Sequence, residues 1–121
     1  MNINRHLRFF ITLFYMILYL PLTSFSQSET SIDSLLLKAD QQVDSFDEKE
    51  AIKTYEKVLN EHPENFEALW NISVLHSTVG YRQEDEEVQE TYFNEALNYA
   101  EKALEFYPDK GLSYYAMAVA K

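Results

Sequence analysis

The stretch YFNEALNYAEKALEFYP, residues 92–108, decides the fold class. It places Ala96, Ala100 and Ala103 four and three positions apart, and Pro108 follows. This spacing puts the three alanines on one face of a helix, and a proline disfavours helical geometry in the residue before it. The stretch therefore predicts a helix that packs closely against another helix through its small face and ends before Pro108.

A second stretch of the same kind lies upstream. Ala51, Tyr55 and Val58 are again four and three positions apart, and Pro63 follows them. The chain has only two glycines and three prolines, and it is rich in strong helix formers. Together these features predict an all-α fold built from antiparallel helix–turn–helix hairpins.

Three further helices are predicted from apolar residues that recur every three or four positions. Each follows a residue whose side-chain oxygen can accept a hydrogen bond from an early backbone N–H group. The predicted helices and their N-caps are 32–43 with Ser31, 66–79 with Asn65, and 110–121 with Asp109.

Other signals mark the remaining helix ends. Asp47 and Glu50 have the spacing of a capping box for the helix that ends near Glu61. Gly80 is predicted to be a C-terminal cap in the left-handed region. The acidic residues 82–91 that follow are predicted to form a solvated extension at a helix start, where acids suit the helix dipole.

With Pro63 and Pro108 in equivalent places, the chain resembles the tetratricopeptide repeat family, whose unit is a helix–turn–helix of about 34 residues. The resemblance implies about two and a half hairpin repeats stacked as a short superhelix, namely 32–65, 66–110 with an insertion at 82–91, and a partial repeat at 111–121. The residues placed at the family's packing positions are Leu35, Ala39, Ala51, Tyr55, Leu69, Ile72, Ala96, Ala100, Ala103, Tyr114, Met117 and Ala118.

A second resemblance rests on Leu69-Trp70, the acidic insertion, and the run Tyr92-x-x-x-Ala96-x-x-Tyr99-Ala100-x-x-Ala103-Leu104. This pattern is similar to the tetratricopeptide-like domain of regulator of microtubule dynamics proteins.

The tetratricopeptide resemblance implies a non-catalytic adaptor that binds a protein or peptide on a concave face lined by the first helices. Asn71 matches the residue that grips a peptide backbone in clamping members, yet only Lys110 could supply the cation of such a clamp, so Asn71 is also explained as a solvated helix residue. Trp70 is either a partner contact or a packing residue between repeats. The residues predicted to line the binding groove are Glu67, Trp70, Asn71, Val74, Ser77 and Thr78.

The last predicted helix has no following helix to cover its Tyr114, Met117 and Ala118 face. Stacks of this kind usually need about three repeats. Two alternatives to an adaptor therefore stay open. The chain is either an N-terminal fragment of a longer repeat protein, or a structural domain that self-associates through its C-terminal helix.

Residues 1–26 have the three parts of a secretory signal: basic Arg5 and Arg8, an apolar run, and Ser24-Phe25-Ser26. We expect cleavage after Ser26, a polar lead-in at 27–31, and export to the periplasm or the medium. The apolar run 9–20 is shorter than the roughly 20 residues that a membrane span needs. The alternative is that this run is not removed and anchors the protein in a membrane.

The chain carries a formal net charge of −10, which repels nucleic-acid phosphates and anionic lipids. Nucleic-acid binding is therefore excluded, and any membrane contact is expected only through the N-terminal segment. The absence of cysteine excludes disulfides and thiolate sites. His62 and His76 have no zinc-site spacing, and His76 is predicted to be a packing residue. Because no Gly-rich loop or nucleophile motif occurs, we expect no catalytic residue, metal or cofactor.

Overall fold

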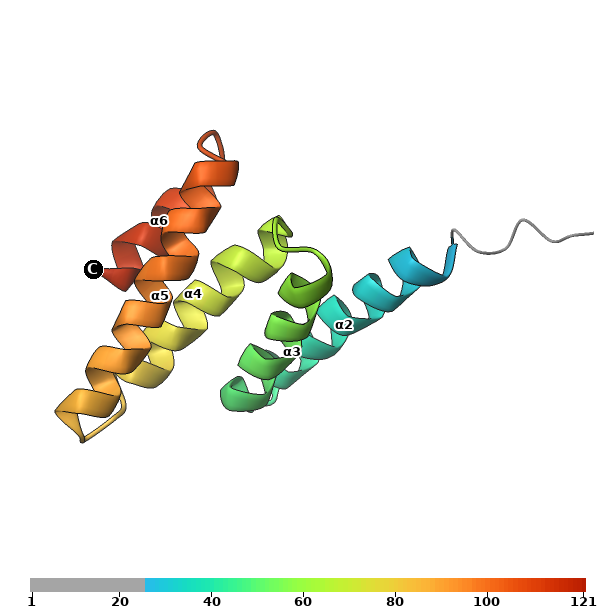
Figure 1. Ribbon diagram of the computed structural model, residues 1–121. Coiled ribbons are helices and arrows are strands. Elements are labelled where there is room, and N and C mark those ends of the chain that lie inside the picture. The colour runs from blue at the N-terminus through green and yellow to red at the C-terminus, as the bar shows by residue number, and fades with distance from the viewer. Residues whose placement is uncertain (1–25) are drawn as a thin grey trace, which may run out of the picture. The chain divides into compact units, whose positions relative to one another are not determined.

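The computed structural model describes the backbone of residues 26–121 and the side chains of residues 32–121. Within this part of the chain the regular structure is entirely α-helical, and consecutive helices form antiparallel hairpins, which confirms the predicted fold class (Figure 1). The predicted signal and its cleavage site lie outside the described residues, apart from Ser26. The helices are α2 (Ser26–Asp44), α3 (Glu48–Glu61), α4 (Phe66–Gly80), α5 (Glu86–Phe106) and α6 (Gly111–Ala120).

The first helix begins earlier than its sequence signals indicated. α2 starts at Ser26, so Ser31 lies inside the helix and the prediction that it is the N-cap is wrong. No glycine or proline interrupts the chain between Ser26 and Asp44, and the polar residues predicted as a lead-in therefore continue the helix.

The start of α3 also differs from the prediction, although the helix ends at Glu61 as expected. Asp47 is the N-cap, but its side chain makes no capping hydrogen bond. The Asp47 N–H donates to the carbonyl of Gln42 at 2.8 Å, so the group that Glu50 would have capped is already satisfied. Glu50 instead accepts a hydrogen bond from Lys53 at 2.5 Å. The predicted capping box is therefore wrong.

The start of α4 is as predicted, because Asn65 Oδ1 accepts a hydrogen bond from the Ala68 N–H at 2.9 Å. The role assigned to Gly80 is wrong, since Gly80 is the last helical residue and its φ is not positive. A Cβ atom at Gly80 would lie 2.9 Å from the Phe93 ring and 3.0 Å from Tyr92 Cβ. Gly80 is therefore needed because α5 approaches the α4 backbone there.

The acidic segment 82–91 divides between a short turn and the beginning of α5. Asp85 caps this helix by accepting from the Val88 N–H at 3.0 Å, and Glu86 and Glu87 lie in the first turn. Carboxylates in this position are stabilised by the partial positive charge at a helix N-terminus. The predicted extension at a helix start is thus confirmed.

The last helix packs through a face that includes Met117, as predicted, but otherwise differs from the predicted one. Lys110, not Asp109, is the N-cap of α6. Tyr114 is 58% exposed and Ala118 is also exposed, so the prediction that they pack inward is wrong. Ser113 sets the rotation, because its hydroxyl lies 3.1 Å from the Ala103 carbonyl and 2.9 Å from the Tyr107 carbonyl. The buried residues of α6 are Ser113, Ala116 and Ala120.

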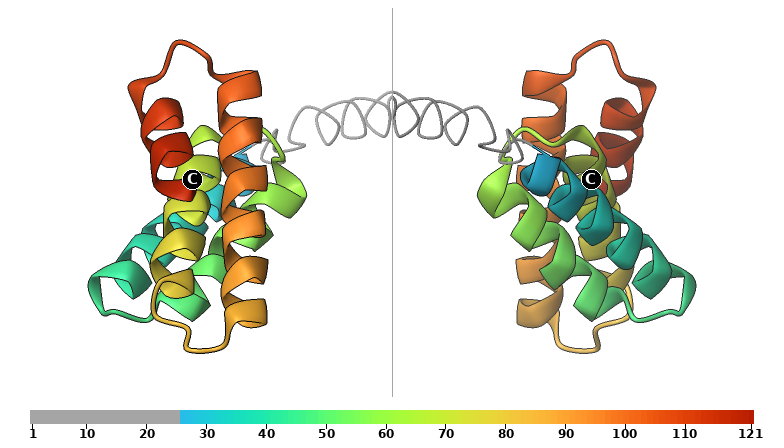
Figure 2. Two further views of the ribbon diagram at one scale, coloured as in Figure 1. Left: turned by 90° about the vertical axis from the view of Figure 1, so that its left-hand side faces the viewer. Right: turned by 90° about the vertical axis from the view of Figure 1, so that its right-hand side faces the viewer.

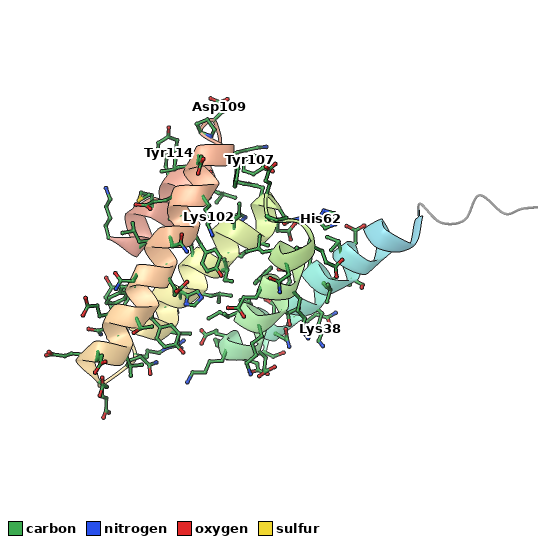
Figure 3. All side chains as sticks on the ribbon, in the orientation of Figure 1. Lys38, His62, Lys102, Tyr107, Asp109 and Tyr114 are labelled. Atoms are coloured by element: carbon green, nitrogen blue, oxygen red, sulfur yellow. The ribbon has the colours of Figure 1, made fainter. Side chains whose placement is uncertain are left out.

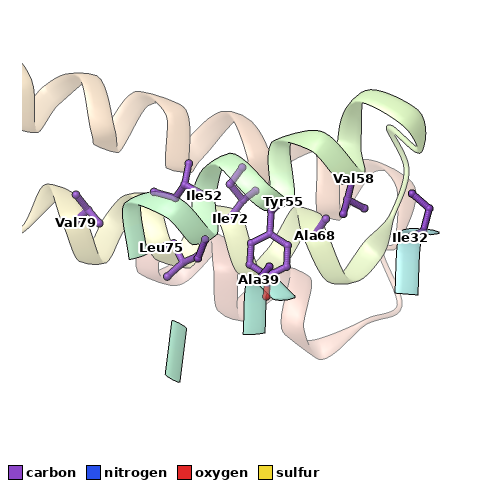
Figure 4. Close-up of a cluster of buried hydrophobic side chains, with 10 residues drawn as sticks. Ile32, Ala39, Ile52, Tyr55, Val58, Ala68, Ile72, Leu75 and Val79 are labelled. Atoms are coloured by element: carbon purple, nitrogen blue, oxygen red, sulfur yellow. The ribbon is translucent and has the colours of Figure 1, made fainter. Parts of the chain in front are cut away.

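Two clusters of buried side chains stabilise the array. The larger cluster lies between α2, α3 and α4, and Tyr55 is fully buried in it with its hydroxyl donating to Asp40 at 2.5 Å (Figure 4). The second cluster joins α4, α5 and α6 and is lined mainly by alanines. The alanines of the larger and second clusters are Ala39, Ala51, Ala68, Ala96, Ala100, Ala116 and Ala120.

Helix α4 belongs to both clusters and lies in contact with α3, α5 and α6 (Figure 2). The hydroxyl of Ser73 on α4 donates to the Ala96 carbonyl on α5 at 2.7 Å, a bond that is fully buried. Such an approach requires small side chains where the two helices meet. The alanine spacing that predicted close helix packing is therefore confirmed at Ala96, Ala100 and Ala103, which are fully buried.

Candidate partner-binding surface

The six residues predicted to line a groove on α4 do not share one surface. Trp70 and Val74 are partly buried against the alanine cluster formed with α5 and α6. They therefore contribute to packing between hairpins, which is one of the two roles expected of Trp70.

Ser77 does not line a groove. Its side chain is fully buried, and its hydroxyl lies within hydrogen-bonding distance of the Ser73 carbonyl at 3.3 Å. Thr78 is partly exposed, but its hydroxyl donates to the Val74 carbonyl at 2.9 Å. The repeat pattern did not predict the burial of Ser77, because a small residue with a hydroxyl group is compatible with a groove and with a tight helix contact.

Of the six residues predicted to line the groove, Glu67 is exposed, and Asn71 lies one turn further along α4 and is partly exposed. The Asn71 side-chain amide donates to the Glu67 carbonyl at 3.0 Å. Partial burial, together with the charges of Asp40 and Asp33 on α2, raises the pKa of Glu67. The charges of Asp33 and Asp40 on α2 thus act on Glu67 of α4, and we call Asp33, Asp40, Glu67 and Asn71 the acidic α2–α4 face.

The cation expected at the edge of this face is already engaged. Lys110 places its Nζ atom 5.5 Å from the centre of the Phe66 ring, and the Phe66 ring lies 4.9 Å from that of Tyr107. A cation over an aromatic face is stabilised by the ring quadrupole. The acidic α2–α4 face therefore lacks the paired cations of a carboxylate clamp among its own residues.

A hollow that the sequence did not reveal lies between the α3–α4 turn and the end of α5. It has a volume of about 420 Å³, and the Tyr107 hydroxyl donates to the Glu64 carbonyl at 2.5 Å on its rim. Tyr107 and His62 come from opposite sides of it (Figure 3). Sequence patterns did not reveal this site because Tyr107 is more than 40 positions away from residues 61–65, which form the rest of its lining. Its lining residues are Glu61, His62, Pro63, Glu64, Asn65 and Tyr107.

His76 is a packing residue, as predicted, and it is only 7% exposed. Its ring lies between Tyr92 and Tyr99 of α5, with ring centres 5.6 Å and 5.7 Å away. Neither ring nitrogen has a hydrogen-bond partner among the described residues. Burial lowers the pKa of His76, while the charge of Glu95 acts weakly in the opposite direction. His76 is therefore neutral in the folded protein at physiological pH.

The described residues contain no group of three or more His, Cys, Asp or Glu side chains arranged to hold a metal ion. Among the helices between residues 26 and 121, none is long and apolar enough to cross a membrane.

Comparison with known proteins places the chain in a family. The sequence model of the family described as regulator of microtubule dynamics protein 1-3 matches residues 35–121, which is more than two thirds of the chain. No curated protein and no solved structure gives a significant match. The match supports the second of the two resemblances found in the sequence, whereas the hairpin array supports the tetratricopeptide resemblance only as far as a helical repeat. The chain therefore belongs to the regulator of microtubule dynamics protein 1-3 family.

Proposed function

We propose that residues 32–121 form a non-catalytic protein-interaction module whose partner binds the acidic α2–α4 face. The family to which the chain belongs and its stack of helical hairpins both support this role. Arrays of this kind use the surface lined by their first helices as an extended binding face. We include in this proposal that the helical hairpins are tetratricopeptide repeats.

The observation that carries the proposal is the convergence of Asp33, Asp40 and Glu67. The charges of Asp40 and Asp33 disfavour the ionised form of Glu67, and a cation placed beside Glu67 would offset that effect. A lysine or arginine of a partner is such a cation, because the described part of the chain offers none of its own there. The partner is therefore a protein segment with basic side chains.

Site-specific photo-crosslinking in the native host tests this proposal. A benzophenone amino acid at Asn71 should yield a crosslinked partner, and Glu67→Lys should abolish that crosslink because it introduces the competing charge. The same probe at Glu101, which is exposed on α5, is the matched control. If Asn71 and Glu101 give the same products, or Glu67→Lys leaves the crosslink unchanged, the binding face is wrongly assigned.

A structural role is the second candidate, and the outer surface of α6 supports it. Leu112, Tyr114 and Tyr115 are 42%, 58% and 51% exposed, and residues 111–120 include no charged side chain. Exposed apolar surface of this kind favours association. Sedimentation of the purified chain should then show an oligomer that Tyr114→Ser with Tyr115→Ser converts to monomer. A monomer before substitution would exclude this candidate.

We also propose that residues 1–26 direct export and are then removed after Ser26. The support is the sequence pattern of basic start, short apolar run and small residues. Sequencing of the N-terminus of protein from the native host should begin at Gln27. Recovery of a chain that still contains residues 9–20 would favour the membrane-anchored alternative.

A further inference from the structure

The two halves of α5 differ in how deeply they are buried. The buried residues Ala96, Ala100 and Ala103 all lie in the second half, where the Ser73 hydroxyl donates to the Ala96 carbonyl at 2.7 Å. None of residues 86–95, which we call the α5 arm, is buried. Segments with few buried contacts open locally at a lower free energy than the rest of a fold. The α5 arm is therefore the part of α5 that leaves α4 most easily.

Aromatic rings make most of the contacts that hold the α5 arm against α4. The Phe93 ring lies against the Gly80 backbone, and its centre is 5.2 Å from that of the Tyr81 ring. Tyr81 is itself 70% exposed, so water reaches this end of the contact. The Gln89 side-chain amide donates to the Gly80 carbonyl at 3.3 Å, which is long for such a bond. Among residues 32–121 no salt bridge joins the arm to α4.

His76 of α4 packs directly against the α5 arm. Its buried ring lies between Tyr92 of the arm and Tyr99 beyond it, with ring centres 5.6 Å and 5.7 Å away. Both of its nitrogens are without a hydrogen-bond partner in the described part of the chain. A buried polar group without a partner destabilises a fold. The imidazole thus brings to this contact a proton acceptor that the closed form leaves unpaired.

The charged groups around His76 do not compensate for a positive charge on its ring. From α5, exposed Glu95 acts on His76 more weakly than burial does. Burial, followed by the charges of Glu56 on α3 and Glu95, raises the pKa of Tyr99, whose ring centre lies 5.4 Å from Lys102 Nζ. Helix α6, which also contacts α4, has no charged side chain. A proton on His76 in the closed form is therefore a buried charge without a partner.

We propose that uptake of a proton by His76 releases the α5 arm from α4 while residues 96–106 stay in place. In the open form water solvates the imidazole and its pKa returns to the ordinary value of about 6.5, whereas burial lowers that pKa in the closed form. Acidification therefore favours the open form, and a return to neutral pH closes the arm. Opening uncovers the side of the larger cluster against which Tyr92 packs, so the exposed apolar surface becomes dependent on pH.

Hydrogen exchange of the purified chain, followed by mass spectrometry of its peptides, tests this proposal. Protection factors, which are corrected for the intrinsic effect of pH on exchange, are compared at pH 7.5 and pH 5.0. The protection of residues 89–95 should fall by about tenfold or more, with an upper limit of about thirtyfold, because one proton with a pKa near 6.5 is linked to opening. At both pH values it should lie about tenfold or more below that of residues 51–58 in α3, which exchange only when the whole domain unfolds.

Substitutions of two histidines assign the pH dependence. His76→Phe keeps an aromatic ring and His76→Gln keeps a polar side chain, and neither replacement titrates between pH 5 and 8. Both should abolish the pH dependence in residues 89–95. His62→Gln is the matched control, because it removes an exposed histidine and should leave the pH dependence intact.

Three results would overturn the proposal. Equal protection in residues 89–95 and 51–58 would mean that His76 takes up its proton only when the whole domain unfolds. Protection of the α5 arm that is the same at both pH values would mean that its opening does not involve His76. A pH dependence that survives both His76 substitutions would assign it to other groups. Crosslinking at Asn71 reports the acidic α2–α4 face at neutral pH, so its outcome is independent of these results.

Discussion

Gly80 and Phe93 meet so closely that no side chain fits between the end of α4 and the start of α5. A Cβ atom at Gly80 would come within 2.9 Å of the Phe93 ring, closer than real Cβ atoms approach a neighbour, and within 3.0 Å of Tyr92 Cβ, which is an unusually tight contact. Since the Phe93 ring also contacts Tyr81, with ring centres 5.2 Å apart, it cannot withdraw without losing that contact. This glycine is therefore required for space and not for backbone conformation.

Gly80→Ala should lower the free energy of unfolding by about 1–3 kcal/mol, the usual cost of overpacking. Chemical denaturation of the purified chain measures it. Gly111→Ala is the matched control, because nothing lies within 4 Å of a Cβ there and alanine is the better helix former. We expect that control to be neutral or slightly stabilising. Equal destabilisation by both substitutions would contradict the steric explanation.

Ala100→Leu should likewise destabilise the fold by about 1–3 kcal/mol, because Ala100 is fully buried in the cluster that joins α4, α5 and α6. Ala51→Leu should do the same in the larger cluster, where Ala51 is also fully buried. Ala118→Leu serves as the control on an exposed position of α6. Thermal unfolding distinguishes them, and an unchanged midpoint for Ala100→Leu would show that the helices separate there easily.

His76 should make the stability fall as the solution becomes acidic. Its pKa is lowered in the folded protein by burial between Tyr92 and Tyr99, whereas in the unfolded chain it has its ordinary value of about 6.5. Below that pH the unfolded state binds a proton that the folded state does not bind. The contribution of His76 is thus complete above about pH 6.5 and is lost as the pH falls, by at most about 1.4 kcal/mol per pH unit.

Unfolding free energies measured between pH 5 and 8 test this linkage. His76→Phe should remove the downward slope below pH 6.5, and His62→Gln should leave it in place because His62 is exposed. Partly buried Glu67 acts in the opposite direction, since its pKa is raised by burial, Asp40 and Asp33, but it is present in every variant and cancels in the comparison. If the unfolding free energy of His76→Phe still falls below pH 6.5, groups other than His76 cause that fall.

Ser113→Ala should loosen α6 selectively. The Ser113 hydroxyl lies within hydrogen-bonding distance of the carbonyls of Ala103 and Tyr107, in a buried position. Loss of such a hydrogen bond costs about 1 kcal/mol. Hydrogen exchange should therefore accelerate in residues 111–120 and remain unchanged in α4. Acceleration throughout the chain would mean that α6 does not open by itself.

The sequence predicted the helices well where side-chain size and proline decide the outcome. The alanines of α3 and α5 permit close packing whatever surrounds them, and Pro63 and Pro108 limit the chain for reasons of local geometry. Helix caps were less predictable. Asp47 could have formed a capping box, but the path of the preceding turn gave its N–H to Gln42 instead.

The rotation of α6 could not be read from its sequence. Residues 111–120 are apolar or small on every side, so no polar face identifies the outside. The rotation of α6 is set by Ser113, whose hydroxyl lies within hydrogen-bonding distance of the carbonyls of Ala103 and Tyr107. These residues are ten or fewer positions away in the sequence, but only the folded structure shows that they meet. Ser77 was misplaced for a similar reason, because a serine leaves no hydrophobic signal when it is buried.

The central position of α4 has a consequence for the history of the chain. Nine of its fifteen residues are buried, against three of the twenty-one residues of α5, so α4 has the fewest positions at which a substitution is free of penalty. Residues 66–80 should accordingly diverge slowest among descendants of a common ancestor, while the turn at Phe46 and the surface of α6 drift or adapt. Distant relatives will be recognised by the α4 segment long after the rest of the sequence has lost its resemblance.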